Sequence, residues 1–340
     1  MADGSGIKDP PAAPKVPGLI YYPDAKPGIT RRRAGRGFAY YAPTGKLIRD
    51  KLERARIIGI AVPPAYEDVW ITPHLNGHLL ATGRDARGRK QYRYHADWAA
   101  HRAASKFEQL AAFGRSLPRL RGCIARWLKA EAGSQELAVA AVLALIDRAS
   151  IRVGNPAYAR ENHTYGATTL QPRHVSLEDD HIEISFPAKG GTRVTQTLRG
   201  KALQKALSRI HDLPGAELAT WTDADGTPRN VRSDHVNAAI AEICGEGVTA
   251  KTFRTWNGTR ASFALALRPG PLTLGAMADC AAEALGNTPA IARSSYIHPE
   301  VLDLARLEPE ARAARLARLK IDEIAGLRAG EAELIGFLEG

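Results

Sequence analysis

The residues best suited to chemistry in this sequence are four cationic side chains, one asparagine and one tyrosine. They are Arg152, Lys189, Lys251, Arg254, Asn287 and Tyr296. Arginine and lysine bind phosphate and other oxyanions, and a tyrosine hydroxyl can act as a nucleophile. Each of these residues also has an ordinary structural interpretation, as a solvated charge, a turn residue or a packed ring. A functional interpretation therefore depends on the whole set and not on any one member.

Common signatures of metal and nucleotide chemistry are missing from the sequence. The segment Thr44–Leu47 lacks the upstream glycine and the hydroxyl of a phosphate-binding loop. His74 and His78 have the spacing of zinc ligands on a helix, but the Asn76-Gly77 pair between them is typical of a turn. No acidic cluster indicates a two-metal nuclease. We therefore expect a site that uses neither a metal nor another cofactor.

The first arginine of the set is predicted to end a strongly apolar helix. Ser134 is a suitable N-cap for a helix over residues 135–152, and Gly154 is suited to end it. Because apolar residues surround this helix on all sides, it is predicted to lie in a core.

A β-hairpin is predicted to carry Lys189. Residues 181–187 and 192–198 alternate apolar and polar side chains, and the segment Ala188–Gly191 joins them as a tight turn. Lys189 would then lie at the tip of the hairpin.

Helices are predicted to carry the remaining members. They cover residues 199–211, 234–244, 249–267, 273–285 and 289–297, with several short ones after them. Lys251 and Arg254 would share one helix face because they are three residues apart. Asn287 follows a helix-ending glycine, and Tyr296 lies near the end of a helix that Thr288 and Pro289 begin.

The remaining sequence predicts an α+β protein with a small β-rich N-terminal domain and a mainly α-helical catalytic domain. We place a flexible tail at residues 1–18, the β-rich domain at 19–98 and the helical domain at 99–340. Strand-like segments at Val69–Thr72 and Gln91–His95 flank a predicted turn within Thr82–Lys90.

The charge balance indicates a polyanionic partner. The net charge is +11, from 47 Lys and Arg against 36 Asp and Glu, and neutralising phosphates releases condensed counterions. The three separated cysteines fit reduced thiols packed in a core. Without a signal peptide or a long apolar run, we expect a soluble, cytoplasmic protein associated with the bacterial nucleoid and not with a membrane.

Taken together, the local settings of Arg152, Lys189, Arg254, Asn287 and Tyr296 resemble the type IB DNA topoisomerases, particularly their compact poxvirus and bacterial branch. The spacings agree with those of the compact members, with 37 residues from Arg152 to Lys189 and nine from Asn287 to Tyr296. The resemblance runs from about residue 69 to residue 299 and includes the stretches 88–94 and 162–170.

The resemblance implies an isomerase that relaxes supercoiled duplex DNA through a 3′-phosphotyrosyl intermediate at Tyr296, without ATP or metal. Arg152 and Arg254 would hold the non-bridging oxygens of the phosphate. Lys189, assisted by Lys251, would protonate the 5′-oxygen. Many relatives have histidine where this chain has Asn287, and an amide can donate a hydrogen bond but cannot supply a proton.

The resemblance also implies a monomer that closes as a clamp around duplex DNA. The residues expected to contact DNA are Gln91, Tyr92, Tyr94, Arg84, Arg87, Arg89, Lys90, Arg93, Asn155 and Tyr158. An alternative for the two strand tyrosines is packing on a core. Poxvirus relatives have lysine at the position of Asn155, so their preferred cleavage sequence is not expected here.

Two other functions fit part of the sequence. A site-specific tyrosine recombinase shares the arginine, lysine and tyrosine chemistry, but normally has histidine where this chain has Lys251. A non-catalytic DNA-binding protein would explain the positive charge but not the coincidence of the separated motifs.

Overall fold

The computed structural model describes residues 16–211, 215 and 217–340, so most of the predicted tail lies outside the described residues. The chain forms two compact units, residues 1–105 and residues 106–340. Each unit has its own hydrophobic core, and the α+β class predicted from the sequence is confirmed.

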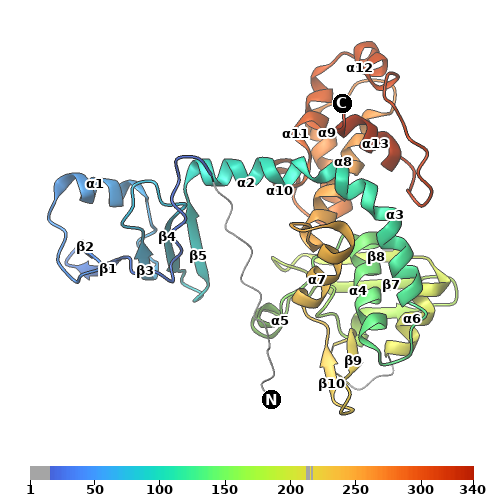
Figure 1. Ribbon diagram of the computed structural model, residues 1–340, viewed down its shortest axis with the longest axis horizontal. Helices are drawn as coiled ribbons and strands as arrows, with labels where there is room; N and C mark the ends of the chain where they lie inside the picture. Colours follow the sequence, from blue (N-terminus) through green and yellow to red (C-terminus); the bar gives the residue numbers. More distant parts are fainter. Residues whose placement is uncertain (1–15, 212–214, 216) are drawn as a thin grey trace, which may run out of the picture. The chain divides into compact units, whose positions relative to one another are not determined.

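Unit 1 is built on a five-stranded antiparallel sheet (Figure 1). Its strand order is β2-β1-β3-β4-β5, with β1 at Ile29–Ala34, β2 at Gly37–Tyr41, β3 at Glu67–Ile71, β4 at Leu79–Arg84 and β5 at Lys90–Tyr94. Helix α1 (Lys51–Gly59) contributes Ile57 to a small core that also contains Ile29 and Ile71. The predicted turn between β4 and β5 is present, closed by a hydrogen bond from the Asp85 amide to the Arg89 carbonyl at 3.0 Å.

Two helices follow the sheet. Helix α2 covers Ala96–Glu108 and helix α3 covers Leu110–Trp127. Helix α3 buries Phe113, Leu117 and Leu120 in the core of unit 2.

The buried helix α4 (Gln135–Ala149) lies at the centre of unit 2. The Ser134 hydroxyl accepts a hydrogen bond from the Leu137 amide at 3.3 Å, as its role as an N-cap predicts. The predicted end at Arg152 and Gly154 is wrong. The helix stops at Ala149 because Ser150 adopts a left-handed conformation with φ of 54°, and Arg152 lies in the loop that follows.

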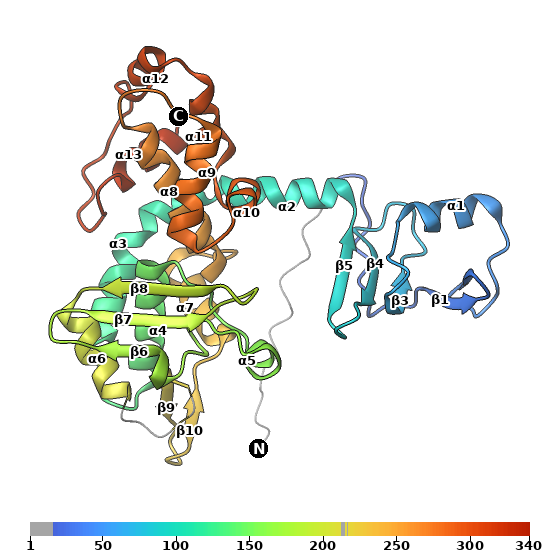
Figure 2. The same cartoon turned by 180° about the vertical axis from the view of Figure 1, so that it is seen from behind.

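Unit 2 also contains two small sheets. Strands β6 (Val175–Leu177), β7 (Ile182–Pro187) and β8 (Arg193–Leu198) form an antiparallel sheet that includes the predicted hairpin and packs over α4 (Figure 2). Strands β9 (Thr220–Thr222) and β10 (Pro228–Asn230) form a second hairpin between the predicted helices 199–211 and 234–244. These strands were not predicted, because three-residue strands are too short to show an alternating pattern.

Five other helices of unit 2 begin and end within two residues of their predicted limits. They are α6 (Lys201–His211), α7 (Ser233–Cys244), α8 (Ala250–Ala266), α9 (Leu274–Leu285) and α10 (Pro289–Tyr296). Short elements not delimited in advance are α5 (Pro156–Asn162), α11 (Pro299–Asp303), α12 (Pro309–Leu316), α13 (Glu331–Leu338) and the 3-10 turns Pro172–His174 and Leu304–Arg306. Helix α8 contacts α3, α4, α7, α9, α10, α11 and α13.

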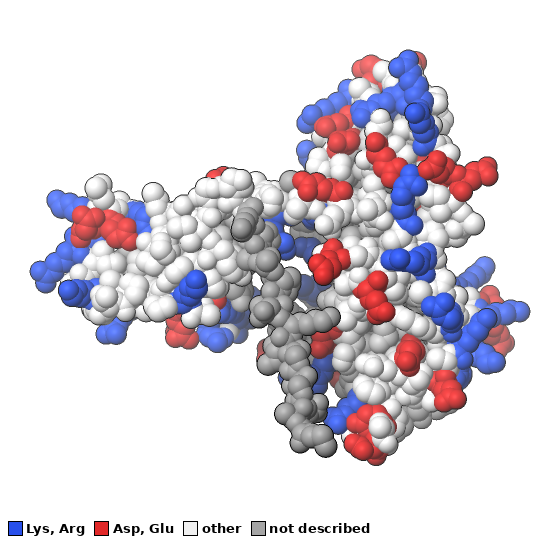
Figure 3. All heavy atoms as spheres, in the orientation of Figure 1, with Lys and Arg blue, Asp and Glu red and all other residues white. Residues whose placement is uncertain are grey.

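The surface carries charges of both signs. On the face seen in Figure 3, Lys and Arg side chains are interspersed with Asp and Glu on each unit. The three cysteines are reduced and only partly buried, so they are less enclosed than predicted. None of the described helices is long and apolar enough to cross a lipid bilayer.

Candidate active site

Arg254 is the most deeply buried member of the predicted set. It lies on α8 with 3% of its surface exposed. Its guanidinium donates to the carbonyl of Ser150, the residue that follows the last turn of α4. It also donates to the carbonyl of Leu285, the last residue of α9, at 2.9 Å. Burial, and secondly the charge of Arg152, lower the pKa of Arg254 to about 10, so it remains a cation at neutral pH. Arg254 thereby joins two helix ends while holding a positive charge inside the protein.

Arg152 and Asn287 are brought together from loops far apart in the sequence. The Arg152 Nη2 donates to the Asn287 Oδ1 at 2.7 Å. Asn287 follows α9, which ends at the left-handed Gly286 as predicted. The Arg152 carbonyl is held by the Ala167 amide at 2.8 Å, and Gly166 passes so close to that carbonyl that a Cβ would lie 2.5 Å from it. The stretch 162–170 therefore supports the Arg152 loop.

Two buried donors at this place have no partner among the described residues. They are the Arg254 Nε and the Asn287 Nδ2. A buried donor without a partner costs about 1–3 kcal/mol, so a bound group that accepts hydrogen bonds here would be stabilised. Because Asn287 accepts from Arg152 through its oxygen, its nitrogen remains available to donate. An anionic oxygen bound here would receive hydrogen bonds from both groups.

Tyr296 lies beside Arg254 on the last turn of α10. Its ring centroid is 5.2 Å from the guanidinium carbon of Arg254, and its side chain is half-buried. Helix α10 begins as predicted, with the Thr288 hydroxyl accepting from the Ile291 amide at 3.4 Å. The ring of the nucleophile candidate is thus close to the buried Arg254 cation.

Helix α8 also fixes the backbone around Tyr296. The Thr259 hydroxyl donates to the Tyr296 carbonyl at 3.2 Å and accepts from the His298 amide at 3.0 Å. A Cβ added to Gly258 would lie 2.7 Å from the Tyr296 carbonyl, so glycine permits the close approach of α10. We did not predict either role. A glycine inside a helix is the sequence signal for close packing that indicates Gly258.

Lys189 lies at the tip of the β7–β8 hairpin, as predicted, with its side chain exposed. The base of the hairpin reaches the buried arginines: Ala188 and Val194 line a small hollow together with Arg152 and Arg254. Lys189 makes no hydrogen bond or ion pair within the described part of the chain, so its ammonium is available to a bound ligand.

Lys251 is exposed in the first turn of α8, while Arg254 three residues later is buried. The charge of Lys251 acts on Lys106, whose pKa is lowered to about 8 by burial and secondly by Lys251. Lys106 itself donates to the Ser295 carbonyl at 2.8 Å, directly before Tyr296. Lys106 was not predicted, because nothing in its local sequence distinguishes it from a surface lysine.

Comparison with known proteins identifies the family. Residues 95–267, about half of the chain, match the family described as eukaryotic DNA topoisomerase I, catalytic core, and residues 37–85 match bacterial DNA topoisomerase IB, N-terminal domain. This chain belongs to the type IB DNA topoisomerases. The family resemblance predicted from the sequence is confirmed.

The relatives of this topoisomerase include viral enzymes. DNA topoisomerase 1B of Acanthamoeba polyphaga mimivirus is 28% identical over 299 residues, covering 83% of this chain and 89% of the relative. DNA topoisomerase 1B of Vaccinia virus strain Copenhagen is 23% identical over 254 residues, covering 71% and 76%. Among solved structures, the XerH site-specific recombinase in a post-cleavage complex has 15% identity and a TM-score of 0.34, covering 54% of this chain and 49% of that one.

The match to the catalytic core ends before the last two residues of the set. Residues 95–267 include Arg152, Lys189, Lys251 and Arg254 but not Asn287 and Tyr296. The contacts from Arg152 to Asn287 and from Arg254 to Tyr296 join those two residues to the matched part.

The predicted DNA-contacting residues of unit 1 lie on or beside the edge strand β5. Tyr92 and Tyr94 are 49% and 46% exposed, and their rings stack at 6.1 Å with an interplanar angle of 7°. The alternative that these tyrosines pack on a core is therefore wrong. Gln91 is half-buried and donates to the Asp85 carboxylate at 3.0 Å.

The predicted phosphate-contacting residues of this topoisomerase are exposed, and most already have acidic or carbonyl partners. Arg84 pairs with Asp68 at 3.4 Å, Arg89 with Asp85 at 2.7 Å and Lys90 with Asp24 at 2.5 Å. Such surface pairs contribute only about 0–1 kcal/mol, so DNA phosphates can replace the carboxylates. Of the other two predicted phosphate contacts, Arg87 is exposed, and Arg93 donates to the Ile60 carbonyl.

The two predicted DNA contacts of unit 2 lie on α5. Asn155 is the N-cap of this helix, and its side chain accepts from the Ala157 amide at 2.8 Å and the Tyr158 amide at 3.3 Å. Tyr158 is 40% exposed. Asn155 therefore has a structural role that lysine could not fill in the same way.

Proposed function

We propose that this topoisomerase relaxes supercoiled duplex DNA by cutting and resealing one strand through a covalent bond between Tyr296 and the 3′-phosphate. The observation that carries this assignment is a half-buried tyrosine beside Arg254, at a site where the Arg254 Nε and the Asn287 Nδ2 are buried donors without a partner among the described residues. A phosphodiester oxygen would satisfy them.

In the cleavage step, the Tyr296 oxygen bonds to phosphorus as the bond to the 5′-oxygen breaks. The phenol proton passes to solvent, and the departing 5′-oxygen takes a proton from Lys189, assisted by Lys251. Because one phosphodiester replaces another, the 5′-hydroxyl can reverse the reaction without ATP. Proton donation of this kind contributes about 10²–10⁴ in rate.

The charge that develops on the non-bridging oxygens is stabilised by Arg152, Arg254 and Asn287. Arg152 also orients Asn287 through their hydrogen bond of 2.7 Å. Because these donors are held before substrate arrives, removal of one should cost on the order of 10²–10³ in rate.

Duplex DNA binding involves both units in this proposal, with the chain acting as a monomeric clamp. The exposed Tyr92–Tyr94 pair and the basic hairpin around it support a role for unit 1. Because its substrate is duplex DNA, we expect the enzyme to act at the bacterial nucleoid.

Relaxation of a negatively supercoiled plasmid in EDTA without ATP tests the proposal. We expect the wild-type protein to give a ladder of relaxed topoisomers, and Tyr296→Phe to bind the plasmid without changing its linking number. A cleavable strand labelled at its 5′ end should also remain attached to denatured wild-type protein but not to the variant, because the protein keeps the fragment that ends in the 3′-phosphate.

Three outcomes would contradict the proposal. They are no relaxation by folded wild type, equal relaxation by Tyr296→Phe, and strand exchange only between specific paired sites. The last result would indicate a recombinase, and binding without relaxation by wild type would indicate a passive DNA-binding protein.

A further inference from the structure

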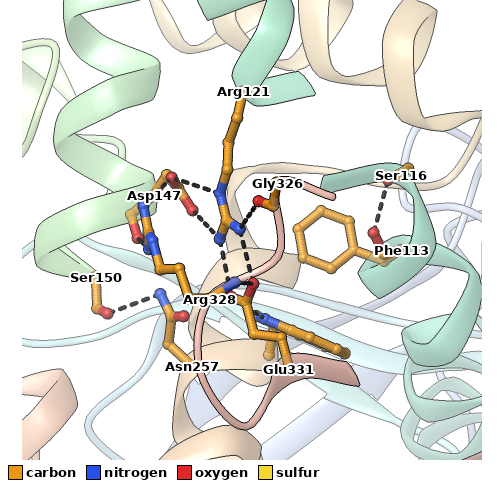
Figure 4. A network of polar contacts seen from close by, with 10 residues as sticks. Phe113, Ser116, Arg121, Asp147, Ser150, Asn257, Gly326, Arg328 and Glu331 are labelled. Carbon is orange, nitrogen blue, oxygen red and sulfur yellow. Dashed lines mark hydrogen bonds and ion pairs between the residues drawn. The ribbon is translucent and has the colours of Figure 1, made fainter. Parts of the chain in front are cut away.

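Four charged side chains from separate parts of unit 2 form a cluster around two buried carboxylates (Figure 4). Arg121 comes from α3, Asp147 from α4, Arg328 from the segment before α13, and Glu331 from the first turn of α13. Asp147 is 4% exposed and Glu331 is fully buried. The reaction proposed above uses none of them, and none has an evident ligand.

The cluster ties the C-terminal segment, which contains Arg328 and α13, to the last turn of α4. The Arg121 guanidinium donates to the Asp147 Oδ1 at 3.1 Å and to the Glu331 Oε2 at 2.7 Å. Arg328 donates to the Asp147 backbone carbonyl at 3.1 Å and to its carboxylate at 2.5 Å, while its own amide donates to Glu331 at 2.7 Å. Asp147 is therefore held both at its side chain and at its backbone.

The turn held in this way leads directly into the catalytic loop. Ser150, three residues after Asp147, takes the left-handed conformation that stops α4. Its carbonyl accepts from Arg254, and its hydroxyl accepts from the Asn257 Nδ2 at 2.9 Å. Arg152 follows two residues later, so a shift of this turn would displace both catalytic arginines.

The cluster also contacts the helix that carries Arg254. The Trp256 indole, 1% exposed on α8, donates to the Glu331 Oε1 at 3.3 Å. The C-terminal segment therefore contacts α4 and α8, the two elements whose ends set the distance between Arg152 and Arg254.

We propose that Arg328 and Glu331 are positioning residues for the catalytic arginine pair. Buried ion pairs add little net stability compared with apolar packing, but they fix orientation because their hydrogen bonds are directional. The C-terminal segment thus keeps the arginines at the separation that the scissile phosphate requires. This inference rests on the proposed function of the site.

The test is single-turnover cleavage by Arg328→Ala at saturating protein, on DNA with an ordinary or a methylphosphonate linkage at the cleavage position. The methylphosphonate is uncharged before attack and has one non-bridging oxygen fewer, so it needs much less charge stabilisation from the arginines. We expect cleavage of ordinary DNA to slow by roughly ten- to a hundredfold with unchanged DNA affinity, because a small misplacement of catalytic groups has effects of this size. On the methylphosphonate, the variant should come within about twofold of wild type, since arginine placement matters much less there.

Arg115→Ala is the matched control. Arg115 also binds the C-terminal segment to α3, through Glu339 at 2.5 Å and Asp322 at 2.8 Å, but it does not contact Asp147. It should cleave both substrates as wild type does. Assays are run at a temperature where thermal unfolding shows every protein folded. If Arg328→Ala is unfolded throughout, Arg328→Lys, which keeps a charge near Asp147 but cannot make both contacts, replaces it.

The outcomes separate this inference from the proposed function. Failure of wild type to cleave ordinary DNA would overturn the proposed function itself. If wild type cleaves, the positioning role is overturned by a normal rate in the folded Arg328 variant, by an equal defect on both substrates, or by an equal defect in Arg115→Ala.

Discussion

At the scale of single residues, Asn287 shows how contacts decide a chemical role. Its oxygen accepts from Arg152, and its nitrogen is buried without a partner among the described residues. An amide in this position can only donate a hydrogen bond to a bound oxygen. We therefore propose that charge stabilisation and proton transfer belong to different residues in this site, with the lysines as the proton donors.

Lys189→Ala tests that division. Loss of the ammonium should slow cleavage of an ordinary strand by about 10²–10⁴. A strand with sulfur at the 5′-bridging position should be cleaved by the variant at nearly the wild-type rate, because a thiolate leaves without a proton. The measurement is single-turnover cleavage of both strands, with the exposed Lys201→Ala on α6 as the control. A defect that persists with sulfur would remove Lys189 from the role of proton donor.

At the scale of elements, helix α8 organises the site. It supplies Arg254, places Thr259 against the backbone on both sides of Tyr296, and lets α10 approach at Gly258. The candidate nucleophile Tyr296 and the phosphate-binding Arg254 proposed above are therefore held by the same helix.

Gly258→Ala should both destabilise the fold and slow cleavage. Alanine normally stabilises a helix interior by about 1 kcal/mol relative to glycine. At this position, however, its Cβ would lie 2.7 Å from the Tyr296 carbonyl and 2.9 Å from the Leu285 Cδ1. Gly122→Ala on α3 is the control, because its Cβ would meet nothing within 4 Å. Denaturant unfolding should show opposite signs for the two variants; equal stabilisation would refute the close approach.

Local signals explain which elements could be predicted. Helices α8, α9 and α10 were predicted to within two residues, because their caps, periodicity and punctuating Gly286 and Pro289 are local features. The end of α4 was misplaced because Ser150 is held by Arg254, which is 104 residues away in the sequence. Likewise, the alternation in β5 could not show that the Tyr92 face is exposed, because burial depends on the partner strands.

At the scale of the whole molecule, we expect DNA affinity to have an electrostatic part and an aromatic part. The net charge of +11 is dispersed among acidic residues, while the stacked Tyr92 and Tyr94 form an exposed aromatic pair. These parts differ in their dependence on salt, since only phosphate contacts release counterions.

Salt titrations of DNA binding should separate the two parts. Arg87→Ala should make the slope of log affinity against log salt shallower by about 0.9 if this exposed side chain contacts one phosphate. The double variant Tyr92→Ala, Tyr94→Ala should weaken binding by about tenfold at every salt concentration with an unchanged slope. Fluorescence anisotropy with a short duplex measures both. An altered slope in the tyrosine variant would contradict the assignment.

The anchoring of Tyr296 has a mechanical consequence. During relaxation, the DNA end bonded to the tyrosine must stay still while the other end turns about the uncut strand, so torque reaches the protein through that single bond. The Thr259 hydrogen bonds and the close contact at Gly258 pass this load to α8, which is packed on all sides by other helices. If Tyr296 is the attachment point, we expect it to hold the bound DNA end rigidly. The phosphate would then return to the same place after each turn, where the rotating 5′-hydroxyl can meet it in line.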